Sequence, residues 1–152
     1  MGNSADPTDA PLCPSAQPEM AGAVAFGVVG GTAEQPRVAH LVQPLPVSDE
    51  LLALVEPAKP AAVFRFAAPC AASACLHFAE RRCRLASRVV ETLPAAVDGL
   101  PACHIRPTCR WWRQEGKAAC LRCPMIVTET ANPSDLLVQA ADPTVYTLRN
   151  PT

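Results

Sequence analysis

The segment Cys103–Pro124, CHIRPTCRWWRQEGKAACLRCP, gathers four cysteines, four arginines and two adjacent tryptophans into 22 residues. The chain has 152 residues, of which only 5% are aromatic and 17 are prolines. Proline limits long helices and strands, so regular elements should be short. The sequence therefore predicts an α+β fold: a small, loop-rich single domain with short strands and short helices, organised around a cysteine-ligated metal centre.

Seven of the eight cysteines fall between residues 70 and 123, in two groups with short gaps. The first is C-x4-C-x7-C and the second is C-x5-C-x10-C-x2-C: Cys70, Cys75 and Cys83, then Cys103, Cys109, Cys120 and Cys123. Thiolates are soft donors that suit iron-sulfur clusters and zinc. The first group has three thiols, so Cys13 or His77 is needed to complete it. All eight cysteines are therefore candidate metal ligands.

The spacing favours iron-sulfur clusters over zinc. Zinc sites usually pair two short C-x2-4-C knuckles, whereas the gaps of seven, five and ten residues here are irregular. Cys123-Pro124 matches the Cys-Pro that closes the bacterial ferredoxin motif. The sequence predicts one or two [4Fe-4S] clusters that serve electron transfer or a redox partner. Zinc, in a module that binds protein or nucleic acid, is the alternative.

The distribution of charge along the chain also indicates that the cysteine-rich segment is the functional one. Residues 1–60 carry two positive and seven negative side chains, a net −5, whereas residues 81–122 carry nine positive and three negative, a net +6. Arginines beside a cluster would offset its negative charge, and a tryptophan would shield it from water. The predicted neighbours of the cofactor are Arg106, Arg110, Arg122 and Trp111. In the zinc alternative the same arginines would contact phosphates and the tryptophans would stack on bases.

A stand-alone enzyme is disfavoured, because the chain shows neither an HExxH motif nor a recognisable catalytic triad. The chain opens without the basic and apolar regions of a secretory signal, and it has no run of about 20 apolar residues. We expect a cytoplasmic protein without a membrane anchor, in which clustered cysteines bind metal rather than form disulfides. A protein redox partner is expected ahead of nucleic acid.

Four regions follow from composition and periodicity. Residues 1–20 are predicted to be a flexible N-terminal arm, and 21–66 to hold a β-hairpin, a helix capped by Ser48 and a further strand. Residues 67–130 form the cysteine-rich metal-binding region, with a helix over 84–93 and another that Gly116 ends. Residues 131–152 supply a final helix, capped by Ser134, and a tail.

Overall fold

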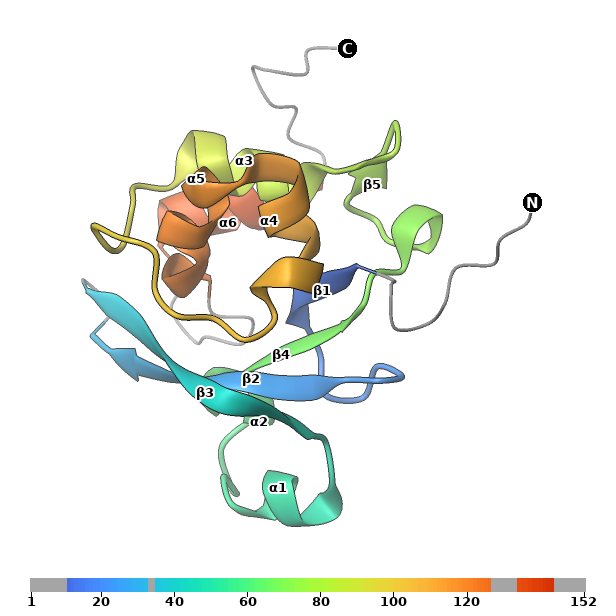
Figure 1. Ribbon diagram of the computed structural model, residues 1–152, viewed down its shortest axis with the longest axis vertical. Helices are drawn as coiled ribbons and strands as arrows, with labels where there is room; N and C mark the ends of the chain where they lie inside the picture. Colours follow the sequence, from blue (N-terminus) through green and yellow to red (C-terminus); the bar gives the residue numbers. More distant parts are fainter. Residues whose placement is uncertain (1–10, 33–34, 127–133, 144–152) are drawn as a thin grey trace.

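The computed structural model describes residues 11–32, 35–126 and 134–143, and it is a small α+β domain. Four strands form an antiparallel sheet in the order β1-β4-β2-β3 (Figure 1). They are β1 (Leu12–Ala16), β2 (Val24–Gly31), β3 (Pro36–Pro46) and β4 (Phe64–Pro69). A separate two-stranded hairpin consists of β5 (Phe78–Ala79) and β6 (Arg82–Cys83).

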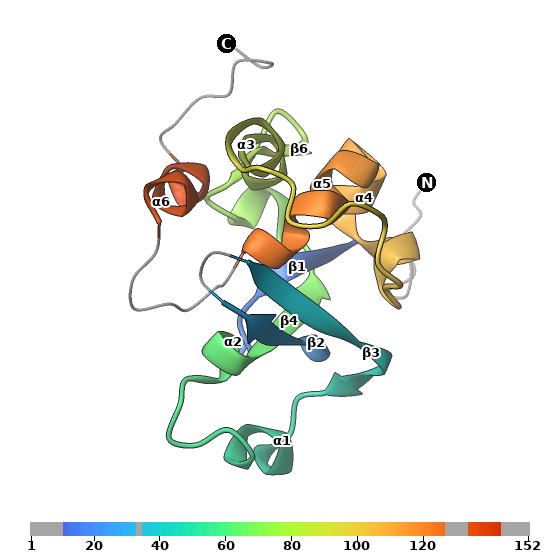
Figure 2. The same ribbon diagram turned by 90° about the vertical axis from the view of Figure 1, so that its left-hand side faces the viewer.

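The short helices of the described residues lie on the two sides of the sheet, as the two views in Figures 1 and 2 show. One side carries α3 (Arg84–Thr92), α4 (Arg110–Glu115), α5 (Lys117–Arg122) and α6 (Asp135–Ala141). The other side carries α1 (Asp49–Ala53) and α2 (Pro60–Val63). Single 3-10 turns η2, η3 and η4 occupy Ala72–Ala74, Arg106–Thr108 and Cys123–Met125. The cysteine-rich region thus forms most of one layer.

Local signals placed several helix ends correctly. The Ser48 hydroxyl accepts the Leu51 N–H at 3.1 Å at the start of α1, and the Ser134 hydroxyl accepts the Leu137 N–H at 3.1 Å at the start of α6. Both serines act as predicted N-caps. Gly116 separates α4 from α5 with φ +70°, a conformation that glycine adopts without steric cost.

Strand β4 is central and is buried on both faces. Phe64 and Phe66 pack in one core cluster with Leu51 of α1 and Ala61 of α2. Successive side chains of a strand point to opposite faces. Arg65 therefore faces the opposite side, toward the cysteine-rich layer, where it is fully buried.

The N-terminal region differs from its prediction as a flexible arm over residues 1–20. Leu12–Ala16 form β1, an edge strand that pairs with β4 in the register Leu12↔Pro69 and Cys13↔Ala68. The pairing is non-local, so the proline-rich local sequence does not reveal it. Residues 1–10, and the predicted tail beyond 143, lie outside the described residues. No helix in the described part of the chain is long and apolar enough to cross a membrane.

Candidate metal centre

Four cysteines from separate parts of the chain come together beside the edge of the sheet; we call Cys13, Cys70, Cys75 and Cys83 the first set. Cys13 lies on β1, Cys70 directly follows β4, and Cys83 ends β6. Burial, together with the nearby thiols of Cys83, Cys70 and Cys75, raises the pKa of Cys13 to about 12. The sequence left Cys13 and His77 as alternatives for the fourth position; in the structure Cys13 is near the other three thiols, whereas the His77 ring contacts Arg88.

The second set consists of the cysteines predicted as one group, Cys103, Cys109, Cys120 and Cys123. All four line a single cavity, together with Trp111 and Arg106 among others. The space between the lining atoms is about 370 Å³, including the part open to solvent, and the centre of a water molecule fits in only about 20 Å³ of it. Burial also raises the pKa of Cys109 to about 12. The Cys109 thiol is thus protonated at neutral pH, and binding a metal there must release its proton.

Four of the eight sulfur atoms accept an N–H hydrogen bond in the described structure. The backbone amides of Ala72, His77 and Ala86 each donate at 3.4 Å to a cysteine two or three residues earlier, namely Cys70, Cys75 and Cys83. The fourth donor is a side chain, since Arg65 donates to Cys123 at 3.2 Å. A neutral thiol is a weak acceptor, whereas a metal-bound thiolate is stabilised by such bonds. The loops are therefore arranged to support charged sulfur.

Arg65 joins the two sets, a role that no motif in the sequence indicates. Its guanidinium donates to the Pro14 carbonyl at 2.8 Å, next to Cys13, and to the Cys123 carbonyl at 2.7 Å. Its side chain is 0% exposed, and its Nε has no hydrogen-bond partner among the described residues. No carboxylate in the described part of the chain pairs with it. Within residues 11–32, 35–126 and 134–143, Arg65 is thus a buried cation without an anionic partner.

Two predicted neighbours of the second set, Arg106 and Trp111, line its cavity. The Arg106 guanidinium also lies 5.5 Å from the ring centroid of Trp112 and donates to the Pro101 carbonyl. Trp111 is 1% exposed. His40, on β3, lines the same cavity, and its pKa is lowered by burial and by the charges of Arg65 and Arg106. The cavity is thus electropositive.

The other two predicted arginines lie elsewhere. Arg122 donates to the backbone carbonyls of Leu93 at 2.7 Å and Ala118 at 2.9 Å, so it holds α3 and α5 together. Arg110 lies over the ring of Phe78 at 5.4 Å and lines a different, surface pocket. His77 places its Nδ1 2.6 Å from the guanidinium of Arg88.

Helix α4, which lies between two cysteines of the second set, holds the first set in place. The Gln114 amide accepts the Cys83 N–H and donates to the Cys83 carbonyl, both at 2.8 Å. The adjacent Glu115 carboxylate is 2% exposed and accepts from Arg82 at 3.0 Å and from the Ser87 hydroxyl at 3.1 Å. The two sets are therefore mechanically connected, which the sequence spacing alone did not indicate.

All eight cysteines are free thiols. Within residues 11–32, 35–126 and 134–143, no group of three or more His, Cys, Asp or Glu side chains is arranged so that it could hold a metal ion. No protein-family model, curated protein or solved structure matches the chain. The role of the two sets must therefore be inferred from the contacts, burial and charges of their own residues.

Proposed function

We propose that this protein binds two [4Fe-4S] clusters, one on each set of four cysteines, and transfers electrons to or from a protein redox partner. The observation that carries the proposal is the gathering of the eight cysteines into two sets of four, with N–H donors on the sulfur atoms of Cys70, Cys75, Cys83 and Cys123. Hydrogen bonds to ligand sulfur stabilise the charge of a cluster and tune its reduction potential. Buried cysteines that serve only packing do not need such donors.

The buried cation Arg65 is a second, independent reason to expect an anionic centre on the second set. Burial of a guanidinium without a counter-ion costs several kcal/mol. Four thiolates leave a [4Fe-4S] centre with about two negative charges. Such a centre on the second set would supply the missing charge beside the cation, through the Cys123 sulfur that Arg65 already contacts.

A cluster is favoured over a single zinc ion by the spacing of the cysteines. Zinc sites usually pair two short C-x2-4-C knuckles, whereas gaps of seven, five and ten residues separate cysteines here. In a four-iron cluster each thiolate binds a different iron, so ligands on separate loops with irregular spacing can serve one centre.

The two sets lie next to one another, as electron transfer between two centres requires. Leu12, the neighbour of Cys13, forms an isolated β-bridge with Cys109. Arg65 connects the Pro14 carbonyl to Cys123. A pair of adjacent clusters is the arrangement of two-cluster ferredoxins, which carry electrons between partners. The cytoplasmic location expected from the sequence remains a prediction.

A pair of variants tests this assignment. Cys120→Ala and Cys75→Ala should each remove about half of the iron, because each damages one set and leaves the other as an internal control for folding. Electron paramagnetic resonance of the reduced protein should show one remaining cluster signal in each variant. Unchanged iron content in both variants would overturn the assignment. A colourless wild-type protein with about two zinc ions would favour the zinc module instead.

A further inference from the structure

A second pocket, outside both cysteine sets, is lined by four arginines. Its walls are Arg81, Arg82, Arg110 and Arg113 with Pro11 and Gln114, and its volume is about 280 Å³. Two of the arginines come from the β5–β6 hairpin and two from α4. Like charges repel, so four guanidinium groups around one hollow are unfavourable unless an anion occupies it.

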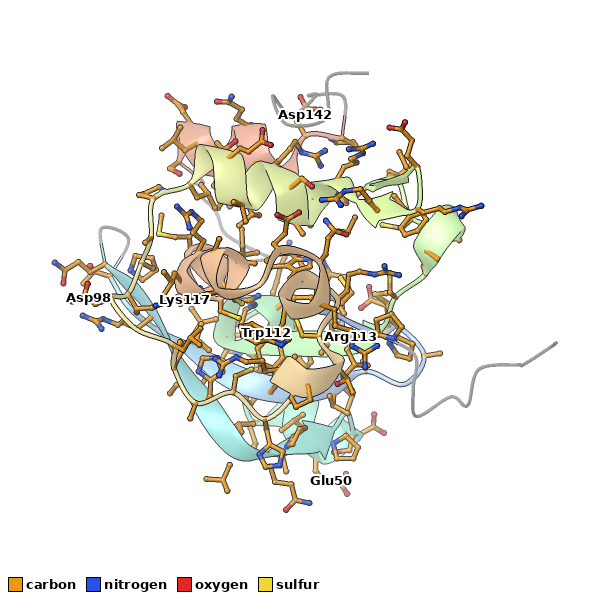
Figure 3. The ribbon with its side chains drawn as sticks, turned by 45° about the horizontal axis from the view of Figure 1, so that its top comes forward. Glu50, Asp98, Trp112, Arg113, Lys117 and Asp142 are labelled. Atoms are coloured by element: carbon orange, nitrogen blue, oxygen red, sulfur yellow. The ribbon has the colours of Figure 1, made fainter. Side chains whose placement is uncertain are left out.

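Little in the protein neutralises this pocket. Arg82 pairs with Glu115, but Arg81, Arg110 and Arg113 have no ion-pair partner among the described residues. The Nε atoms of Arg82 and Arg110 are buried and have no hydrogen-bond partner there. Figure 3 labels the carboxylates Glu50, Asp98 and Asp142, and none of them lies near Arg113.

The β5–β6 hairpin has an unfavourable backbone conformation in the turn that carries Arg81, at the wall of this pocket. Glu80 and Arg81 form the two-residue turn between β5 and β6, with φ of +54° and +65°. Such turns strongly prefer Asn-Gly, because both residues need positive φ. Side chains other than Gly cost about 1–2 kcal/mol in this conformation. This turn has the strained conformation despite its cost, and it places Arg81 next to Arg82 at the pocket.

Four of the five remaining cations of the basic segment 81–122 interact within the protein, which argues against an extended nucleic-acid surface. Arg84 pairs with Glu80, and Arg88 is buried against His77 and the Ala140 carbonyl. Arg106 and Arg122 donate to backbone carbonyls. The fifth cation, Lys117, is exposed, and Arg113 of the pocket also donates its Nε–H to the Pro107 carbonyl at 3.0 Å. Most of the available positive charge is thus concentrated in one hollow.

We propose that this pocket binds a small molecule through a phosphate or sulfate group. Guanidinium groups bind such oxyanions with paired, charge-assisted hydrogen bonds. The pocket adjoins the first set, since Arg82 precedes Cys83 and the Pro11 carbonyl accepts the Cys70 N–H at 2.8 Å. A bound anion would therefore lie beside the first centre. The site goes beyond the proposed electron transfer and does not depend on which metal the cysteines hold.

Calorimetric titration of the full, metal-loaded chain with inorganic phosphate and pyrophosphate, at constant ionic strength, tests the site. We expect saturable binding of one anion per chain, with sulfate as a competitor. Arg81→Gln and Arg113→Gln, both at exposed positions, should each weaken binding by about tenfold, since each removes charge-assisted hydrogen bonds. Arg37→Gln removes an exposed arginine of β3 and should change the affinity by less than about twofold.

Three results would overturn the proposal. Binding that does not saturate, or that falls equally in Arg37→Gln, would indicate only general electrostatic attraction. Tight binding of a single-stranded oligonucleotide that phosphate and pyrophosphate do not displace would indicate a nucleic-acid surface instead. Because iron content is measured separately, failure here leaves the cluster proposal intact, and loss of the clusters leaves the anion titration interpretable.

Discussion

Arg65 is a cation in the middle of a central strand, and its surroundings compensate only part of the cost of burial. Two carbonyls and one sulfur accept its hydrogen bonds, and its guanidinium carbon lies 5.3 Å from the ring centroid of Phe26. A hydrogen bond to a charged group contributes about 1.5–3 kcal/mol. The missing contribution is a negative charge, which a thiolate-bound cluster would supply.

Arg65→Met should lower the reduction potential of the second centre. Methionine keeps a long apolar side chain but removes the positive charge that favours the more negative, reduced cluster. We expect a shift on the order of 60 mV, equivalent to about 1.4 kcal/mol for one electron. Potentiometric titration followed by electron paramagnetic resonance would measure it.

Arg122→Met is the matched control. Arg122 is close to Cys123 in sequence, but its guanidinium donates to carbonyls of α3 and α5 rather than to sulfur. The potential should therefore stay unchanged in this variant. An equal shift in both variants would mean that Arg65 has no special relation to the centre.

The sequence could predict the strand around Arg65 but not the role of this residue. The run Phe64-Arg65-Phe66 alternates, and such a pattern normally places the polar residue in solvent. Whether both faces of a strand are covered depends on what packs on it, and the covering layer comes from residues after 69. The position of Arg106 and Trp111 at the cavity could be predicted, because they lie between the cysteines of the same segment; their role beside a cofactor stays a prediction.

At the scale of elements, β1 is decisive for the first set. Its pairing with β4 places Cys13 opposite Ala68, two residues before Cys70. Cys13 is thereby brought to cysteines at least 57 positions further along the chain. The hairpin of β2 with β3 and the helix caps could be predicted because their signals are local. The β1–β4 pairing has no local signal.

Two truncated chains test whether the N-terminal residues form a flexible arm or a strand that the fold and the first set need. A chain that begins at Pro11 should retain both clusters and its melting temperature, because β1 and Cys13 are intact. A chain that begins at Gln17 should lose about half of its iron and unfold at lower temperature, since the edge of the sheet and one ligand are gone. Iron analysis and circular dichroism would show this. Full iron content in the shorter chain would exclude Cys13 as a ligand.

Helix α4 contacts both cysteine sets, which accounts for the polar residues Gln114 and Glu115 that follow its two tryptophans. Trp111 lines the cavity of the second set, whereas Gln114 and Glu115 hold Cys83 and Arg82 at the first set. One short helix therefore serves both sets, from its two sides. The spacing of cysteines cannot reveal this, because the partners of Gln114 and Glu115 lie about 30 residues earlier in the sequence.

Gln114→Leu should lower the free energy of unfolding by about 2–5 kcal/mol, because it leaves the Cys83 N–H and carbonyl without their partner. Iron should be lost first from the first set, which is the set that Gln114 positions. Chemical denaturation of the loaded protein would measure the stability change. Gln139→Leu, on the exposed side of α6, is the matched control and should change stability by less than about 0.5 kcal/mol. Similar losses in both variants would contradict the role of Gln114.

At the scale of the whole molecule, the two cysteine sets are built from interleaved parts of the chain. The first set takes Cys13 from the N-terminal strand and is held by α4, and the second contacts Arg65 from the central strand. Both sets therefore depend on the same sheet, which acts as their common support. The α+β class was predictable from composition, whereas this interleaving depends on contacts between distant segments.

Chemical analysis of protein purified without oxygen tests the central claim most directly. Two [4Fe-4S] clusters predict about eight iron atoms and about eight acid-labile sulfides per chain, in a brown sample. Roughly half of each would indicate that only one set is loaded. A colourless sample with about two zinc ions and no sulfide, or one without any metal, would contradict the account.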